Sequence, residues 1–149
     1  MSDAFSPWTL YLPFATKVYV YGFTNAAYQQ RIRVTFENGT VQTLTGQGEG
    51  NRATSPASFD YTTPSTGSHL NGYQVVVDIS YSKDGSTWTA SQVAGAGCSL
   101  GWTAATYLVA SEDWIDVDWN DAVVQFLWYN PPPVRNAALS ARKKLLEGG

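Results

Sequence analysis

The sequence predicts an all-β fold, an antiparallel β-sandwich of about eight to nine strands with a short C-terminal extension. Apolar and polar residues alternate with a period of two over several short runs, as expected for strands that bury one face. Gly, Pro, Asn and Asp separate these runs, which is typical of antiparallel sandwiches. Aromatic residues make up 14% of the 149 residues, as much as the charged ones, so the chain has enough apolar surface for one buried core.

The strands are expected where the alternation is clearest, and turn residues separate them. The expected strands are residues 17–21, 31–36, 40–44, 73–81, 86–89, 105–109 and 122–128. Asn38-Gly39 predicts a two-residue hairpin turn, because these residue types adopt a positive φ at low cost. Asp84-Gly85 predicts a second turn of the same kind.

Two stretches do not follow the strand pattern. Residues 46–72 are rich in Gly, Ser, Thr and Pro and poor in apolar residues, so we expect one or two long surface loops there. Pro131-Pro132-Pro133 ends the last strand, because proline cannot donate to a β-ladder. The sequence therefore divides into a sandwich domain over 1–130 and a tail over 131–149 with a weak helical pattern.

Composition and charge exclude several classes of protein. The net charge is −3, but the segment from Val134 carries +3, which leaves −6 for residues 1–133 and argues against a nucleic-acid partner. No apolar run reaches the roughly 20 residues of a membrane helix, so membrane insertion is not expected. The single Cys98, expected to be half-buried, excludes an intrachain disulfide. The N-terminus lacks the features of a secretory signal, which predicts a cytoplasmic protein or one released without a classical signal peptide.

The residues that carry chemistry lie in one short acidic segment. Its carboxylates are Glu112, Asp113, Asp116, Asp118 and Asp121, and Asn120 adds an amide oxygen. No Lys or Arg occurs between Gly85 and Val134. We therefore expect a bound cation to offset the repulsion among the carboxylates. Calcium binds about six to eight oxygen ligands in flexible geometry, and this segment could supply several of them. An EF-hand is excluded, because Asp121 and Leu127 stand where that loop requires Gly and Glu.

Three other interpretations of the acidic segment remain. It could be a solvated acidic turn, or calcium could only stiffen a loop in a structural or adhesive sandwich. It could also belong to a glycosidase, which needs one protonated and one ionised carboxyl group. No Ser-His-Asp, Cys-His or Lys constellation accompanies the acids, and we therefore expect that the protein is not an enzyme.

Two segments resemble the bacterial two-calcium fucose/mannose-binding lectins. The first is Ala110-Ser111-Glu112-Asp113 together with Asp116-x-Asp118-Trp119-Asn120-Asp121-Ala122-Val123-Val124, which is similar to the calcium loop of that family. The second is Leu12-Pro13-Phe14-Ala15-Thr16-Lys17 with Gly22-Phe23-Thr24-Asn25. Certain fungal fruiting-body fucose-binding lectins share the sandwich. The resemblance implies a non-catalytic protein that binds fucosylated or mannosylated glycans with one or two calcium ions, as a homodimer or larger assembly.

The resemblance also implies which residues form the site. The metal ligands would be Asn25, Glu112, Asp116, Asp118, Asn120 and Asp121. The carbohydrate-binding residues would be Asn25, Ala26, Ala27, Tyr28, Glu112, Asp113, Trp114, Asp116 and Asp118. Within this set, residues 26–28 occupy the family's specificity loop, Asp113 accepts a hydrogen bond from the sugar, and Trp114 is the candidate to cover its apolar face.

The C-terminal region departs from the family pattern. In the bacterial lectins the chain ends just past the last strand, and its terminal carboxylate enters the calcium site of the neighbouring subunit. Here Pro131 stands near that point and the chain continues to Gly149. Another group could complete the site, one ion could be lost, or binding could have become independent of metal.

Overall fold

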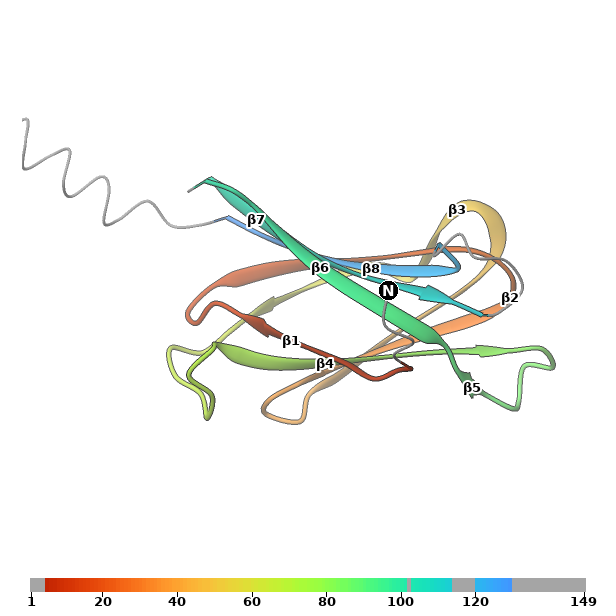
Figure 1. Cartoon of the computed structure of the whole chain (residues 1–149), viewed down its shortest axis with the longest axis horizontal. Helices are drawn as coiled ribbons and strands as arrows, with labels where there is room; N and C mark the ends of the chain where they lie inside the picture. Colours follow the sequence, from red (N-terminus) through yellow and green to blue (C-terminus); the bar gives the residue numbers. More distant parts are fainter. Residues whose placement is uncertain (1–4, 102, 114–119, 130–149) are drawn as a thin grey trace, which may run out of the picture.

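The computed structural model describes residues 5–101, 103–113 and 120–129, which form eight antiparallel strands (Figure 1). The strands are β1 (Trp8–Leu12), β2 (Lys17–Phe36), β3 (Val41–Thr62), β4 (Tyr73–Ser82), β5 (Thr89–Ala90), β6 (Gln92–Leu100), β7 (Ala104–Glu112) and β8 (Ala122–Trp128). These ranges contain no helix, and therefore none that is long and apolar enough to cross a membrane. The predicted tail 131–149 lies outside the described residues.

The strands build two layers that share the two longest strands. The first part of β2, residues 18–24, pairs with β8, and β7 and β6 continue this layer. The later part of β2, residues 29–36, pairs with β4, and β1 lies beyond it. In Figure 1, β2 bends back at the right-hand end, so that its two parts lie in the upper and lower layers. The all-β antiparallel sandwich predicted from the alternation is confirmed.

Strand β3 follows β2 through both layers, so the prediction of a loop is wrong for residues 46–62, whereas residues 63–72 form a connection without strands, as predicted. The pairing of β2 and β3 contains three register shifts between Tyr21 and Gln30, where the chain turns from one layer to the other. Gly48, Gly50 and Asn51 have positive φ values of 112°, 91° and 54°, which let β3 make the same turn. The beginning of β3 was predicted as the strand over 40–44, but its later part was not, because this edge strand has mostly exposed side chains and lacks the apolar alternation of a half-buried strand.

The other differences concern short or small-residue strands. β1 and β6 were not predicted, since β6 contains Ala, Gly, Cys and Ser in place of large apolar residues. Residues 86–88 are not a strand, because three bonds to Asp84 Oδ1 hold this segment as a turn: Ser82 Oγ, Ser86 N and Thr87 N all donate to it. The backbone donors of Thr87 and Ser86 hold the pKa of Asp84 well below its usual range. Cys98 is exposed on β6, so the expectation that it is half-buried is wrong.

The core fills the space between the layers with alternate residues of each strand. β2 and β4 supply much of it, each burying every second side chain over most of its length. Three aromatic rings close one end: Tyr61 stacks on Phe36 with centroids 3.7 Å apart, and its hydroxyl lies 2.9 Å from that of Tyr73. Burying each large apolar side chain contributes about 1.5–3 kcal/mol, so this alternation is what holds the two layers together.

A methyl group at Gly22 is expected to destabilise the fold. The added Cβ would collide with Thr54 Oγ1 and lie 2.9 Å from Leu44 Cδ1, where β2 passes close to β3. Gly22→Ala should lower the free energy of unfolding by about 1–3 kcal/mol, measured by urea denaturation. Gly39→Ala is a useful comparison, because at that turn the cost comes from a φ of 90° and not from a collision. A Gly22→Ala variant as stable as the parent would contradict the close approach.

The stability of the aromatic cluster is expected to depend on alkaline pH. Burial and the hydrogen bond to Tyr73 raise the pKa of Tyr61 from 10.0 to about 12. The unfolded chain therefore loses this proton first, so the contribution of Tyr61 is complete below pH 10 and is lost as the pH rises towards about 12. Tyr61→Phe should flatten the fall of the urea midpoint over this range, with the exposed Tyr129→Phe as control. An unchanged slope would exclude this linkage.

Candidate functional site

The acidic site lies where β7 ends and β8 begins. Ser111 and Ala122 are paired in register, and the Ser111 hydroxyl both accepts from Ala122 N and donates to Ala122 O, each at 3.1 Å. Asp121 N also donates to Ser111 O at 3.2 Å. These bonds hold the two strands together up to the point where the acidic residues begin.

Three carboxylates meet at this point and are almost completely buried. Glu112, Asp113 and Asp121 each place one oxygen within 4.8 Å of the others, and none is more than 4% exposed. Asp113 N donates to Asp121 Oδ2 at 2.6 Å. The pKa of Asp121 is raised to about 8, mainly by burial and also by the negative charges of Asp113 and Glu112, against the bond from Asp113 N, which lowers it.

These residues fit a hard divalent cation. Asn120 Oδ1 is buried beside the cluster and has no hydrogen-bond partner among the residues that the structure describes. A buried amide oxygen without a donor is costly, and carboxylate and amide oxygens are the ligands that calcium prefers. Glu112, Asn120 and Asp121, all predicted as ligands, therefore lie together. Asp116, Asp118 and Trp114 lie outside the described residues, so their assignments remain predictions.

Asn25 is brought to the same place by β2. Its backbone N donates to Asp121 O at 2.9 Å, which places this segment against the start of β8. The side-chain oxygen of Asn25 accepts a hydrogen bond from Gly50 N at 2.6 Å. The oxygen that Asn25 could offer to a metal ion is therefore its main-chain carbonyl oxygen. Asn25 lies within the continuous strand β2 at its bend, and not in a hairpin turn. The role of Gly50 on β3 was missed, because nothing in the sequence links it to Asn25.

The next three residues differ in their environment. Ala26 is 3% exposed, Ala27 is exposed and Tyr28 is half-buried. The Tyr28 ring stacks on Tyr81 with centroids 6.2 Å apart, and Lys83 Nζ lies 5.4 Å from its centroid. Tyr28 therefore packs along β4, and Ala27 is the member of the predicted specificity segment with an exposed side chain.

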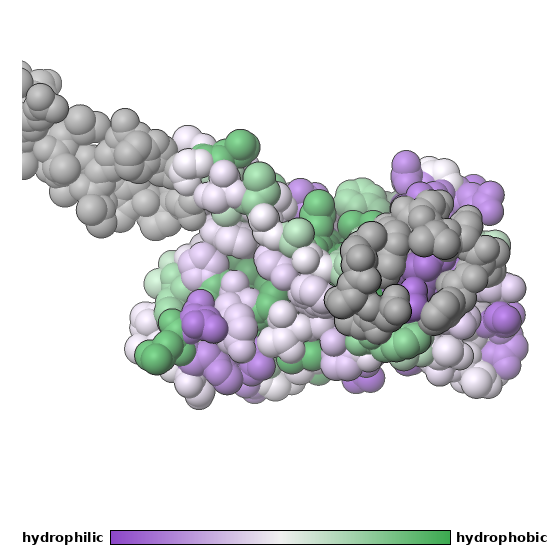
Figure 2. All heavy atoms as spheres, viewed as in Figure 1, coloured by the Kyte–Doolittle hydropathy of each residue, from purple (hydrophilic) through white to green (hydrophobic). Residues whose placement is uncertain are grey.

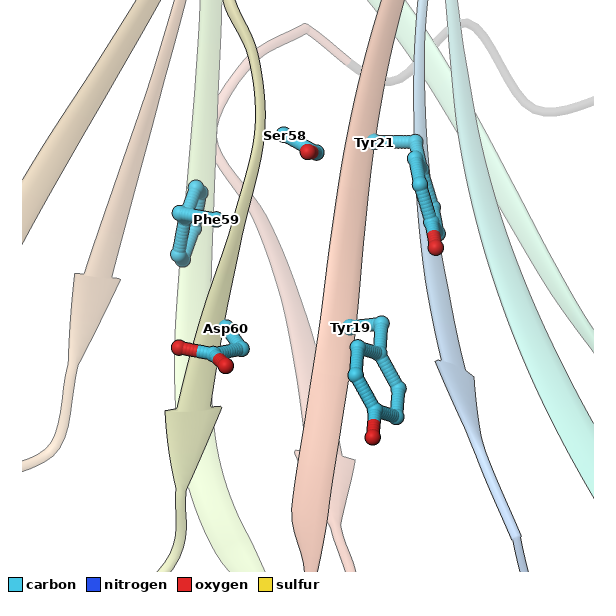
Figure 3. A pocket seen from close by; sticks show the side chains of 5 residues that line it. All are labelled: Tyr19, Tyr21, Ser58, Phe59 and Asp60. Carbon is cyan, nitrogen blue, oxygen red and sulfur yellow. The ribbon is translucent and has the colours of Figure 1, made fainter.

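A separate depression lies on the outer face of β2 and β3. Its volume is about 260 Å³, and it is lined by Tyr19, Tyr21, Ser58, Phe59 and Asp60, which Figure 3 shows on the two neighbouring strands. Lys17 Nζ lies 3.3 Å from Asp60 Oδ2, so the two side chains form an exposed ion pair. Hydrophobic and hydrophilic residues are interspersed over the face shown in Figure 2.

Comparisons with known proteins match both the fold and the sequence. The family description "Fucose-binding lectin II (PA-IIL)" matches residues 10–130. The Ralstonia solanacearum high-affinity mannose-binding lectin is 25% identical with a TM-score of 0.66, over 80% of this chain and 94% of its own. No curated protein matches.

Two further solved structures share the fold. The C-terminal domain of the BC2L-C lectin from Burkholderia cenocepacia has a TM-score of 0.65 at 20% identity, over 84% of this chain and 97% of its own. The Chromobacterium violaceum lectin CV2L, solved with alpha-methyl-fucoside, has a TM-score of 0.62 at 21% identity, over 80% and 94%.

The antiparallel sandwich and the family match define a carbohydrate-binding lectin. Within that class, the chain belongs to the fucose-binding lectin II (PA-IIL) family. The resemblance stated from the acidic segment and from residues 12–25 is thereby confirmed.

Removing one carboxyl group from the cluster is expected to stabilise the protein when divalent cations are absent. Asp121→Asn keeps an oxygen that can accept from Asp113 N, but removes a group that on folding must either take up a proton or carry a buried negative charge. In the presence of a chelator, the variant should gain on the order of 1 kcal/mol in free energy of unfolding. Asp60→Asn, at an exposed carboxylate, is the control. A less stable Asp121→Asn variant would show that the carboxylate stabilises the fold without a cation.

Proposed function

We propose that this lectin binds fucose- or mannose-type sugars on glycans through a calcium site at the end of β7 and β8. The observation that carries the proposal is the burial of Glu112, Asp113 and Asp121 against one another in a member of this family. Buried carboxylates in such proximity are tolerated best with a divalent cation between them.

Separate residues of the site would bind the calcium ion and the sugar. Glu112, Asn120 and Asp121 would hold the ion, together with Asp116 and Asp118 from the family pattern. When bound, calcium supplies open coordination positions for two neighbouring sugar hydroxyls.

Sugar recognition would fall to other groups of the same site. The Asp113 carboxylate would accept a charge-assisted hydrogen bond from a sugar hydroxyl. The small side chains of Ala26 and Ala27 leave room for the sugar, and Trp114 would cover its apolar face.

In this proposal the protein catalyses no reaction, and its affinity for glycans comes from several sugar-binding sites acting together. Each monosaccharide site is weak, and joining sites through self-association raises the effective concentration of the second one. We therefore infer a homodimer or larger homo-oligomer whose partners are fucosylated or mannosylated glycans.

Glycan titrations with calcium and with chelator test the proposal. Methyl α-fucoside and methyl α-mannoside should bind in calcium, and chelator or Asp121→Asn should weaken binding at least about tenfold. Asp60→Asn, remote from the site, should bind as the parent does. Calcium-dependent melting without any sugar response would instead support a cation that only stiffens the fold. Turnover of a chromogenic glycoside would overturn the assignment as a non-enzyme.

A further inference from the structure

The outer face of the layer that contains β6, β7 and β8 is uncharged over most of its extent. This layer is the upper one in Figure 1. On β8 the residues that point away from the core are Val123, Gln125 and Leu127. Paired residues lie on the same face of a sheet, so Leu108 of β7 lies beside Gln125. No residue that shares this face is charged between 94 and 100 on β6, 104 and 110 on β7, or 19 and 23 on β2.

Large apolar side chains of this face remain in contact with solvent. Leu100 is 71% exposed, Leu108 42% and Phe23 38%. Such surfaces mark sites of association, since the centre of a protein interface is apolar and depleted of charge. Lys17 and Asp60 lie at the border of the face, where interfaces have their polar rim.

The face is large enough for a stable interface. With β3 and the first part of β2 it spans five strands, and β8 has seven residues. At about 3.3 Å per residue and about 4.8 Å per strand, it measures roughly 23 Å by 24 Å, or about 550 Å² in plan. Side chains roughen this surface and add to its area, so it approaches the roughly 600–1,000 Å² that each partner buries in a standard interface.

The face is also complementary to itself. The hollow of about 260 Å³ at Tyr19 and Tyr21 lies on β2 and β3, to one side of β8 (Figure 3). Leu108 is exposed on β7, to the other side of β8. Tyr21 pairs with Gln125, and Gln125 pairs with Leu108, so the hollow and the leucine lie in one row across the sheet. A copy related by a two-fold axis along β8 would therefore place its Leu108 over the hollow and receive the first Leu108 in its own.

The charges of the molecule favour a second copy over other occupants. Residues 1–133 are net negative, which repels acidic proteins and anionic lipid surfaces. A basic partner would find no carboxylate within the face, and Asp60 at its border is already paired with Lys17. A second copy offers an equally flat, uncharged sheet, and two such sheets pack about 10 Å apart with their strands within about 30° of each other.

We propose that two copies of this chain pack these outer faces together about a two-fold axis along β8, with Leu108 of each copy seated at Tyr19 and Tyr21 of the other. This inference rests on the proposed function for its expectation of self-association, and it assigns the surface and the arrangement. Because the axis runs along β8, both acidic sites lie at the same end of the dimer. A surface that carries several glycans therefore meets both sites at once.

The mass of the protein in solution tests the surface. In light scattering after gel filtration, in calcium, the parent should have the mass of a dimer or of an even multiple. Leu108→Lys buries an unpaired charge in the interface and should raise the dimer dissociation constant at least about tenfold. Val41→Lys is the matched control, because Val41 is also 42% exposed but pairs with Thr35 in the other layer. Leu108→Lys should bind methyl α-fucoside as the parent does.

Cross-linking tests the arrangement without weakening the interface. The axis along β8 brings β6 of one copy over β3 of the other, so the exposed Cys98 lies one row of residues from Ser58 of the other copy, at the border that a reagent can reach. Within one chain, four strand spacings of about 4.8 Å separate the two residues. A short bis-maleimide should therefore link Ser58→Cys into covalent dimers. The parent and Ser58→Cys combined with Cys98→Ser should stay unlinked.

The possible failures are distinguishable. A parent that is monomeric at every concentration, a Leu108→Lys variant that stays dimeric, or an unlinked Ser58→Cys variant would overturn the interface and leave monosaccharide binding intact. Adsorption of a monomeric parent to neutral lipid vesicles would assign the face to a membrane surface instead. Binding of no saccharide by a dimeric parent would overturn the proposed function and not the interface.

Discussion

The repulsion among three buried carboxylates is the constraint on which the functional end of this molecule depends. Glu112, Asp113 and Asp121 are forced together by the pairing of β7 with β8, and burial removes the water that would otherwise screen them. The bond from Asp113 N to Asp121 relieves part of this repulsion, and Asn120 contributes an oxygen that has no donor within the described part of the chain. Without a positive charge between the carboxylates, this arrangement lowers the stability of the folded state.

The bend shared by β2 and β3 positions the remaining parts of the site. Because β2 leaves one layer and enters the other, Asn25 lies against Asp121 while Gln29 and Gln30 already pair with the opposite layer. Gly22 permits the close approach of the two strands at the start of this bend. The same bend of β2 and β3 therefore connects the two layers of the sandwich and positions residues of the site.

The sequence predicted those parts of the molecule in which one face is buried and the other is not. β4 and β8 were found because their apolar residues alternate, and Glu112, Asn120 and Asp121 were found because they lie close together in the chain. The second half of β3 could not be found, because an exposed edge strand carries no such alternation. The contact of Asn25 with Asp121 spans most of the chain, so only the family resemblance pointed to it.

The irregular course of β3 also affects the self-association of the protein. Among the described strands, the long β3 pairs with β2 alone, and long unpaired edges readily accept a strand from another chain. Its left-handed residues at 48, 50 and 51 twist the free edge, and the flanking Glu49 and Arg52 place charges there. Open-ended, fibre-like addition of further chains along this edge is thereby disfavoured.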